Sequence, residues 1–458
     1  MTAYKVTNPA TGEVEREFPE ATDADIHTAL DRAGGAFPSW AATDPAQRAE
    51  LLSRVADIYA RRKSELAAII TREMGKPHGQ AQAEIDIVVS IYRYYAQNGQ
   101  EFLRTESVDD APDGSAVVQS DPYGVLLGIM PWNFPYYQVA RFAAPNLMVG
   151  NTILLKHAPQ CPESAQAMEE IFIEAGLPEG AYVNIFATNE QISDIVIPDP
   201  RVQGVSLTGS ERAGSAVASA AGKNLKKVVL ELGGNDPFLV LDREILPQAV
   251  RGALQGRMLN AGQACNAAKR IIVLDDIYDE FLEQLDSAVG NLELRDPTDE
   301  NTFIGPMSSE SAAEDLDSQV QDAISKGANL HHGGRRADRD GAWYEPTLLT
   351  GITQEMRAYR EELFGPVAMV FRVRDEEEAI ALANDSDYGL SASVNATDVE
   401  HAQQVGRRIE TGMVFINEPA GTAAQLPFGG VKRSGVGREL GRFGMEEFVN
   451  KRLVKVAD

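Results

Sequence analysis

Cysteine is nearly absent from this sequence, with only Cys161 and Cys265 in 458 residues. Two cysteines cannot build a disulfide framework, so the sequence favours a reducing compartment, and we expect a cytoplasmic protein. Long apolar runs are missing too: we find no uninterrupted stretch of about 18 apolar residues, which argues against a membrane span. The stretch MTAYKVTNPATGEVEREF has neither a basic start nor an apolar core, so we expect no secretory signal.

Positive charge is also scarce. The 42 lysines and arginines face 68 acidic residues, which gives a net charge of −26, and only 12 of the 42 are lysine. Nucleic acid is therefore an unsuitable partner, because phosphate binding needs a basic patch. A surplus of carboxylates repels itself, and salt screens that repulsion. We predict a halophilic origin, with an ordinary acidic mesophilic protein as the alternative.

Several familiar site signatures are missing as well. No GxGxxG follows a predicted strand, and GSERAGS (Gly209–Ser215) lacks the P-loop lysine, so nucleoside triphosphate hydrolysis finds little support. The histidines show no HExxH or Cys-His ligand spacing, and we expect no metal. The pair His331-His332, followed by two glycines, resembles a surface turn.

Helical patterns dominate the first 100 residues. In AQRAELLSRVADIYARRKSELAAIITREMG, apolar residues recur at helical spacing and Gly75 closes the run. The polar stretch TESVDDAPDGSAVVQSDP then predicts a hairpin or connecting arm. Because one hydrophobic core stops growing at roughly 250–300 residues, we expect two or three domains.

From Tyr123 onward, short apolar runs alternate with helical ones. The runs are YGVLLGIMP, NTILLKHAP, AYVNIFAT, VQGVSLTGS, KKVVLELGG and PFLVLD, then, between Asn235 and Gly430, RIIVLDD, EPTLLTGI and VAMVFRV. Such alternation predicts an α/β fold with a doubly wound sheet of parallel strands, followed by a second α/β unit. The tail NKRLVKVAD predicts a strand, either at a sheet edge or added to a neighbouring chain.

Four residues that lie in or between these runs each allow a structural or a functional interpretation. Ser210 caps a helix, and a helix N-terminus also favours pyrophosphate. Asn133 lies in the proline-aromatic corner PWNFP, where a rigid amide suits an oxyanion hole. Glu231 ends a buried run, as a neutral-pH base would. Cys265, in NAGQAC, is either an inert buried thiol or a nucleophile with no histidine nearby.

Together, the motifs PWNFP, LLKHAP, LTGS, ELGG, NAGQAC, EELFGPV and PFGGVKRSG resemble the aldehyde dehydrogenase superfamily, in matching order over roughly residues 5–455. The likeness is strongest to short NAD(P)-linked succinate-semialdehyde dehydrogenases. It implies a Rossmann-like dinucleotide-binding domain (1–100 and 123–234) and a catalytic domain (235–432). It also implies a small β oligomerisation arm (101–122 and 445–458) and a homodimer or homotetramer.

The same resemblance implies the roles of individual residues. Cys265 attacks an aldehyde, and the Asn133 amide and the Cys265 backbone N–H hold the alkoxide. Hydride transfer to NAD or NADP leaves a thioester, which water activated by Glu231 hydrolyses. The cofactor-binding residues that it implies are Trp132, Lys156, Gly209, Ser210, Gly214, Glu362 and Phe364.

Cofactor and substrate are less constrained by the sequence. Many NAD-preferring relatives carry an acid three positions after the ribose-binding lysine, and Pro159 stands there, so NAD and NADP both stay open. Arg141 aligns with an arginine that holds the distal carboxylate of succinate semialdehyde, although it could instead pair with a structural carboxylate. A second anchoring arginine is replaced by Leu259, and whether Arg257 reaches the site stays open.

We therefore expect oxidation of a small-molecule aldehyde, most simply succinate semialdehyde to succinate. Another aliphatic or aromatic aldehyde, or a non-catalytic binding protein of the same fold, is the alternative. Phosphorylating or CoA-acylating relatives often lack the glutamate base, so Glu231 favours hydrolysis. Neither nucleic acid nor a membrane is expected as a partner.

Overall fold

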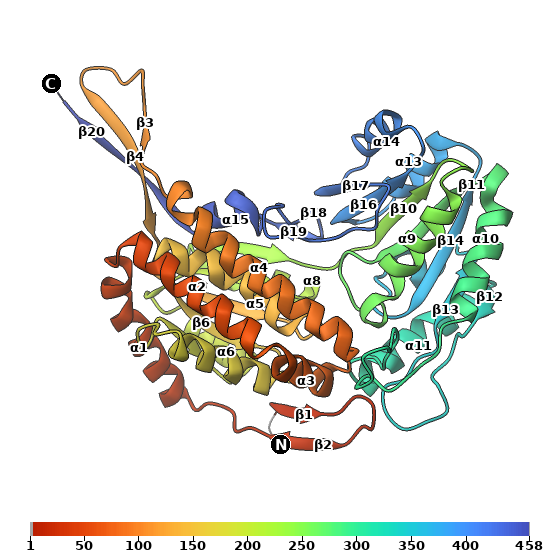
Figure 1. Cartoon of the computed structure of the whole chain (residues 1–458), viewed down its shortest axis with the longest axis horizontal. Coiled ribbons are helices and arrows are strands. Elements are labelled where there is room, and N and C mark those ends of the chain that lie inside the picture. Colours follow the sequence, from red (N-terminus) through yellow and green to blue (C-terminus); the bar gives the residue numbers. More distant parts are fainter. Residues whose placement is uncertain (1–2, 458) are drawn as a thin grey trace.

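Two α/β lobes lie side by side in the computed structural model, which describes residues 3–457, and a β arm projects from the first lobe (Figure 1). Positions 1, 2 and 458, at the ends of the predicted ranges 1–100 and 445–458, lie outside the described residues. No helix within residues 3–457 is both long and apolar enough to cross a membrane.

A six-stranded sheet forms the centre of the first lobe, in the order β19-β9-β8-β5-β6-β7 within residues 3–457. Its strands are β5 (Val125–Met130), β6 (Thr152–His157), β7 (Tyr182–Asn184), β8 (Val202–Thr208), β9 (Lys227–Glu231) and β19 (Gly435–Val436). All pair in parallel except β19, which is antiparallel to β9. The chain starts this sheet at β5 and extends it in both directions, which confirms the doubly wound prediction.

Helices cover both faces of this sheet. They are α1 (Asp23–Ala41), α2 (Pro45–Arg61), α3 (Lys63–Met74), α4 (His78–Phe102), α5 (Pro135–Val149), α6 (Pro162–Glu174), α7 (Asn189–Gln191), a π-helical turn (Ile192–Val196) and α8 (Glu211–Lys223). Neighbouring strand residues serve opposite faces: Leu126 packs with α2, α4 and α5, whereas Leu127 packs with α1. Runs apolar on both faces therefore became buried parallel strands, as predicted.

The second lobe repeats this plan with a seven-stranded sheet, in the order β12-β13-β14-β11-β10-β16-β17 within residues 3–457. Its strands are β10 (Asp236–Val240), β11 (Ala268–Leu274), β12 (Asn329–His332), β13 (Thr347–Thr350), β14 (Val367–Val373), β16 (Ser391–Asn395) and β17 (Met413–Ile416). Its helices are α9 (Leu246–Met258), a 3₁₀ turn (Leu259–Gly262), α10 (Asp275–Gly290), α11 (Glu310–Ser325), α12 (Arg357–Arg360), α13 (Glu376–Asn384) and α14 (Val399–Gly406).

The predicted turn at His331-His332 is wrong. These histidines end β12, an edge strand antiparallel to β13, and the turn begins one residue later at Gly333 and Gly334, both with positive φ. A short strand that pairs on one side only needs no apolar pattern, which is why its sequence resembled a turn.

The arm is a three-stranded sheet of β3 (Glu106–Ser107), β4 (Ser115–Pro122) and β20 (Val449–Val456). The C-terminal tail is thus a strand, as predicted, and pairs along the whole of β4. One side of β20 has no neighbouring strand among residues 3–457, and Leu453 on it is 62% exposed. Smaller elements complete the chain: the hairpin of β1 (Lys5–Thr7) and β2 (Val14–Glu17), the pair β15 (Tyr388–Gly389) and β18 (Val431–Lys432), and α15 (Gly441–Glu446).

Candidate active site

Cys265 lies between two cavities where the lobes meet. One cavity, of about 260 Å³, is lined by seven residues that the sequence singled out, which come from both lobes, and by five others from the first lobe. Those seven residues are Trp132, Asn133, Gly209, Ser210, Cys265, Glu362 and Phe364. The other cavity, of about 300 Å³, contains Cys265 together with Arg141, Tyr137, Thr422 and Phe428. A thiol that opens on both cavities can meet one ligand from each.

The topology explains this convergence. Trp132 and Asn133 follow β5, Gly209 follows β8, and Gly233 follows β9, so the cavity lies at the carboxyl ends of parallel strands. In doubly wound sheets this edge is where ligands bind. Cys265 reaches the same place from the second lobe, on the loop between the 3₁₀ turn and β11.

The loop before Cys265 is held in an uncommon backbone conformation. Asn260 and Ala261 have φ values of 55° and 51°, in the left-handed region, which costs about 1–2 kcal/mol for each residue. Hydrogen bonds hold them there: Gln80 Oε1 accepts from the Asn260 N–H at 2.8 Å, and Asn260 Nδ2 donates to the Asn133 carbonyl at 3.0 Å. The segment 260–265, called the nucleophile loop after the predicted role of Cys265, and the corner at Asn133 are therefore fixed to each other.

Burial and neighbouring charges shift the pKa of the Cys265 thiol in opposite directions. Burial raises the pKa of its thiol to about 12, whereas the guanidinium of Arg141 and the ammonium of Lys269 oppose that rise. Two carboxylates, Glu362 and Glu231, raise it further. The thiolate therefore depends on the nearby cations and on whatever fills the two cavities.

The amide of Asn133 is 4% exposed and preorganised. Its Nδ2 donates one hydrogen to the Gln263 carbonyl at 3.1 Å, so one amide hydrogen is left for a ligand. Lys76 Nζ also donates to the Asn133 backbone carbonyl, at 2.9 Å. A rigid donor beside a thiol is the geometry that stabilises a developing oxyanion.

Glu231 ends β9 outside the lining of both cavities, and its carboxylate raises the pKa of the Cys265 thiol. Among the described residues neither of its carboxyl oxygens has a hydrogen-bond partner. Burial raises the pKa of Glu231 well above its usual value; Arg141 lowers it and Glu439 raises it. A buried carboxyl with free oxygens and a raised pKa suits a general base near neutral pH.

Arg141 is fully buried and belongs to a charged pair. Its Nε lies 2.6 Å from Oε2 of Glu439, and its guanidinium stacks over the ring of Phe428 at 4.3 Å. The sequence left open whether Arg141 holds a substrate or pairs with a structural carboxylate. In the structure Arg141 lines the cavity beside Cys265 and also pairs with the carboxylate of Glu439.

The helix N-terminus at Ser210 suits a diphosphate. Ser210 caps α8, and a Cβ at Gly209 would meet nothing closer than Leu207 at 3.7 Å, so a ligand can approach the backbone there. Lys156, at the end of β6, and Gly214, on α8, lie outside the cavity lining. Burial lowers the pKa of Lys156 to about 8. The residues around Gly209 thus fit a dinucleotide such as NAD or NADP.

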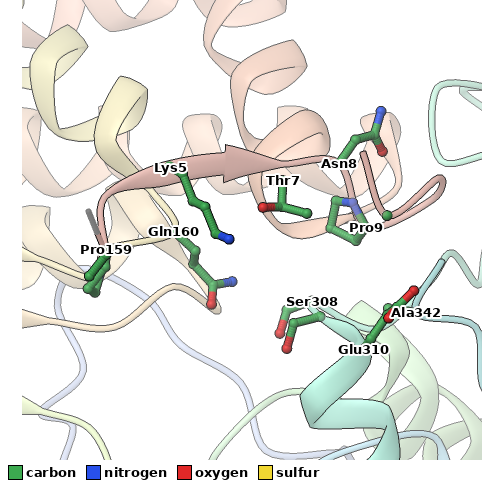
Figure 2. A pocket seen from close by; sticks show the side chains of 12 residues that line it. Lys5, Thr7, Asn8, Pro9, Pro159, Gln160, Ser308, Glu310 and Ala342 are labelled. Atoms are coloured by element: carbon green, nitrogen blue, oxygen red, sulfur yellow. The ribbon is translucent and has the colours of Figure 1, made fainter. Parts of the chain in front are cut away.

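A further cavity lies apart from this chemistry, between the β1–β2 hairpin and the start of α11. Figure 2 shows its lining, where Lys5 and Gln160 approach Ser308 from the other side of the cavity. Its volume is about 450 Å³, and its lining includes Pro159, the position considered above for cofactor choice, but none of the residues predicted to act on the aldehyde or to bind the cofactor. It is therefore not the candidate active site.

Sequence reasoning missed several groups at the site. Lys269 and Glu439 are buried charges that contact the predicted residues, and Tyr137 shares a 2.7 Å hydrogen bond with Thr422 in the cavity beside Cys265. A lysine at the start of the apolar run RIIVL was the available signal for Lys269. Arg257 is also buried, but it donates only to backbone carbonyls, at Gly262, Leu363, Gly365 and Val367, and does not reach the site.

Comparisons with known proteins agree with this geometry. The chain is 53% identical to the succinate-semialdehyde dehydrogenase [NADP(+)] of Deinococcus radiodurans, over 99% of this chain and 94% of that protein. It is 44% identical to the succinate semialdehyde dehydrogenase [NAD(P)+] Sad of Escherichia coli K12, over 98% and 96%. The crystal structure of succinic semialdehyde dehydrogenase from Streptococcus pyogenes, in complex with NADP+, matches with a TM-score of 0.97 at 42% identity, over 99% of this chain and 100% of that one.

The family model for the aldehyde dehydrogenase family matches residues 1–454. That match spans both lobes and the arm, so it includes Cys265, Asn133 and the helix N-terminus at Ser210. The chain belongs to the aldehyde dehydrogenase family.

Proposed function

We propose that this enzyme oxidises succinate semialdehyde to succinate, with NADP or NAD as the oxidant. The observation that carries the proposal is the position of Cys265 between two cavities, one with a helix N-terminus for a dinucleotide and one with the buried cation Arg141. The names of the relatives from Deinococcus and Escherichia support the same substrate.

The chemistry begins with the thiolate of Cys265. Its Sγ forms a bond to the aldehyde carbon, and the carbonyl oxygen becomes an alkoxide held by the Asn133 amide and the Cys265 N–H. A single such donor typically lowers the free-energy barrier of the reaction by about 3–4 kcal/mol. A bound nicotinamide supplies the hydride acceptor that converts the adduct to a thioester.

Glu231 completes the reaction as the base. It takes a proton from water while the water oxygen bonds to the thioester carbon, and the C–S bond then breaks to release the acid and the Cys265 thiolate. Because Glu231 lines neither cavity, it acts through an intervening water or turns toward the thioester.

The substrate's far carboxylate is assigned to Arg141. The Nη atoms of Arg141 make only long contacts, at 3.4 Å to Tyr137 and 3.5 Å to Thr208, so a carboxylate can compete for them. The hydroxyls of Tyr137 and Thr422 add neutral donors in the same cavity. Glu439 also favours a second candidate, an uncharged aldehyde, because it already balances the charge on Arg141.

A steady-state comparison of succinate semialdehyde with butanal tests these candidates, using both cofactors. Arg141→Met should lower kcat/KM with both aldehydes, because the lost guanidinium raises the pKa of the Cys265 thiol, but the loss should be about 10- to 100-fold larger for succinate semialdehyde than for butanal. Because that change strands the carboxyl of Glu439, the double variant Arg141→Met with Glu439→Gln is the matched control and should show the same selective loss. Equal losses for both aldehydes would favour the uncharged substrate, and Cys265→Ala should abolish NAD(P)H formation with either.

A further inference from the structure

Lys269 connects the nucleophile loop to the cofactor cavity. It lies four residues after Cys265, in β11, and its side chain is 0% exposed. Its Nζ donates to the carbonyls of Ala264 at 2.9 Å and Cys265 at 2.7 Å, and lies 3.0 Å from Oε1 of Glu362. An ammonium has three hydrogens, so these three contacts use all of them and fix its position.

The contact with Ala264 has a consequence for the neighbouring N–H. A peptide group is planar and trans, so the carbonyl of Ala264 and the N–H of Cys265 belong to one rigid unit and point in opposite directions. Holding that oxygen therefore aims the N–H. A charged donor on the oxygen also polarises the peptide, which strengthens the N–H as a donor.

We propose that Lys269 is a positioning residue that orients and polarises the Cys265 N–H of the oxyanion hole and couples it to Glu362. This inference rests on the proposed thiol mechanism. It does not depend on which aldehyde is the substrate.

The coupling to Glu362 runs through one carboxyl oxygen. Oε1 is taken by Lys269 and by the Gly234 N–H at 3.2 Å, which leaves Oε2 for the cofactor. A Cβ at Gly234 would lie 2.4 Å from the Cys265 carbonyl oxygen, so the two loops pack backbone against backbone. Lys269 thus decides which oxygen of Glu362 faces the cavity.

The charges around the thiol mean that loss of the Lys269 charge can be measured as a change in the pH at which the Cys265 thiolate forms. Arg141 faces Cys265 from α5 and Lys269 from β11, whereas Glu362 and Glu231 oppose them from the segment after α12 and from β9. The phenol of Tyr137, from α5, completes this set. Removal of the Lys269 charge leaves two carboxylates against one cation, so thiolate formation should require a higher pH.

The test compares Lys269→Met with Arg270→Met in the full-length enzyme. Arg270 is the adjacent buried cation and also donates to backbone carbonyls, at Asn235, Leu382 and Ala383, but none of these carbonyls belongs to the loop around Cys265. Two readouts are measured: kcat and aldehyde KM, and the pH dependence of Cys265 alkylation by iodoacetamide, located by peptide mass mapping. Cys161 is fully buried, which makes the label selective.

Lys269→Met should lower kcat at least about tenfold with little change in aldehyde KM, because it weakens one oxyanion donor without removing it. It should also move the alkylation midpoint to higher pH. Arg270→Met should lower the melting temperature and leave the alkylation midpoint in place. The proposal is overturned if folded Lys269→Met keeps both its kcat and its alkylation midpoint. It is also overturned if Lys269→Met and Arg270→Met lose the same amount of kcat and neither variant moves the alkylation midpoint.

A second variant covers the case in which Lys269→Met does not fold. Glu362→Gln keeps the lysine contacts with the nucleophile loop but removes the carboxylate, so the alkylation midpoint should move to lower pH. A midpoint that stays or rises contradicts the coupling. Alkylation needs neither aldehyde nor cofactor, so a failure of the proposed oxidation and a failure of the Lys269 role are distinguishable.

Discussion

At the scale of single residues, we predict that the ionisation of Glu231 controls hydrolysis of the thioester. Its raised pKa keeps the carboxyl neutral at low pH, and only the carboxylate can take a proton, so kcat should rise with pH through that pKa. Glu439→Gln removes a charge that raises the pKa, so the rising limb should move to lower pH. The pH profile of kcat measures this, with Glu73→Gln, a buried carboxyl that caps α6 through Ser164, as control. A limb that moves equally in both variants would contradict the link.

We also expect a single residue, Pro159, to influence cofactor choice. The ring of Pro159 stands three positions after Lys156 and offers no charge against a 2′-phosphate. Pro159→Glu should therefore lower kcat/KM for NADP at least about tenfold, since a like charge beside a phosphate costs more than about 1.4 kcal/mol in a partly buried site, while NAD use is kept or improved. The control is Pro159→Gln, which changes shape without charge and should shift the ratio far less. Equal effects on both cofactors would show that this position does not contact the ribose.

The sequence singled out the residues that we predict to act on the substrate, but not the buried charged residues that contact them. Cys265, Asn133 and Glu231 each stand in a recognisable motif, so the sequence alone was enough to single them out, although their roles stay predictions. Lys269 and Glu439 could not be assigned, because the oppositely charged partner of each, Glu362 or Arg141, comes from an element far away in the chain. The role of a buried charged residue can be assigned only when the residue of opposite charge beside it is known.

At the scale of elements, Gly75 tests the predicted helix end. It ends α3 with φ 76°, and a Cβ there would lie 2.7 Å from Pro306. Gly75→Ala should lower the free energy of unfolding by more than about 1 kcal/mol, from the left-handed backbone alone. Gly35, inside α1, is the matched control: an added Cβ there would meet nothing within 4 Å, and Gly35→Ala should raise stability by about 0.5–1 kcal/mol. Urea unfolding compares them, and similar effects from both would contradict the cap argument.

Helices and strands were predictable where burial required apolar residues in a regular pattern along the sequence. The runs that became β5, β6, β8 and β11 are apolar on both faces because helices cover both sides of their sheets. The strand β12 was missed because three of its four residues are exposed and carry no such period. The division of the chain into the predicted domains stays a prediction, as does the oligomerisation role of the arm.

At the scale of the whole molecule, the arm offers an unpaired edge for a second copy of the chain. Leu453 is exposed on β20, so Leu453→Asp should not disturb the fold of one chain. If the arm joins subunits, that change should shift the mass toward a monomer, measured by light scattering during size-exclusion chromatography. Ile173→Asp is the matched control, since Ile173 is 63% exposed on α6, a helix that lies away from the arm in Figure 1. The same mass for both variants and the unaltered enzyme would rule out the edge of β20 as the interface.

The net charge of −26 sets two opposing responses to salt. Salt weakens exposed ion pairs such as Arg243–Glu280, but each such pair contributes only about 0–1 kcal/mol. It also screens the mutual repulsion of carboxylates that have no cation to pair with, and that repulsion grows with the whole surplus. The second effect should win, so the free energy of unfolding at pH 7 should rise as sodium chloride is added. Near pH 4.7, where the net charge vanishes, the rise should disappear. Stability that is flat or falling with salt at pH 7 would show that the acidic surplus is no adaptation to a salty cytoplasm.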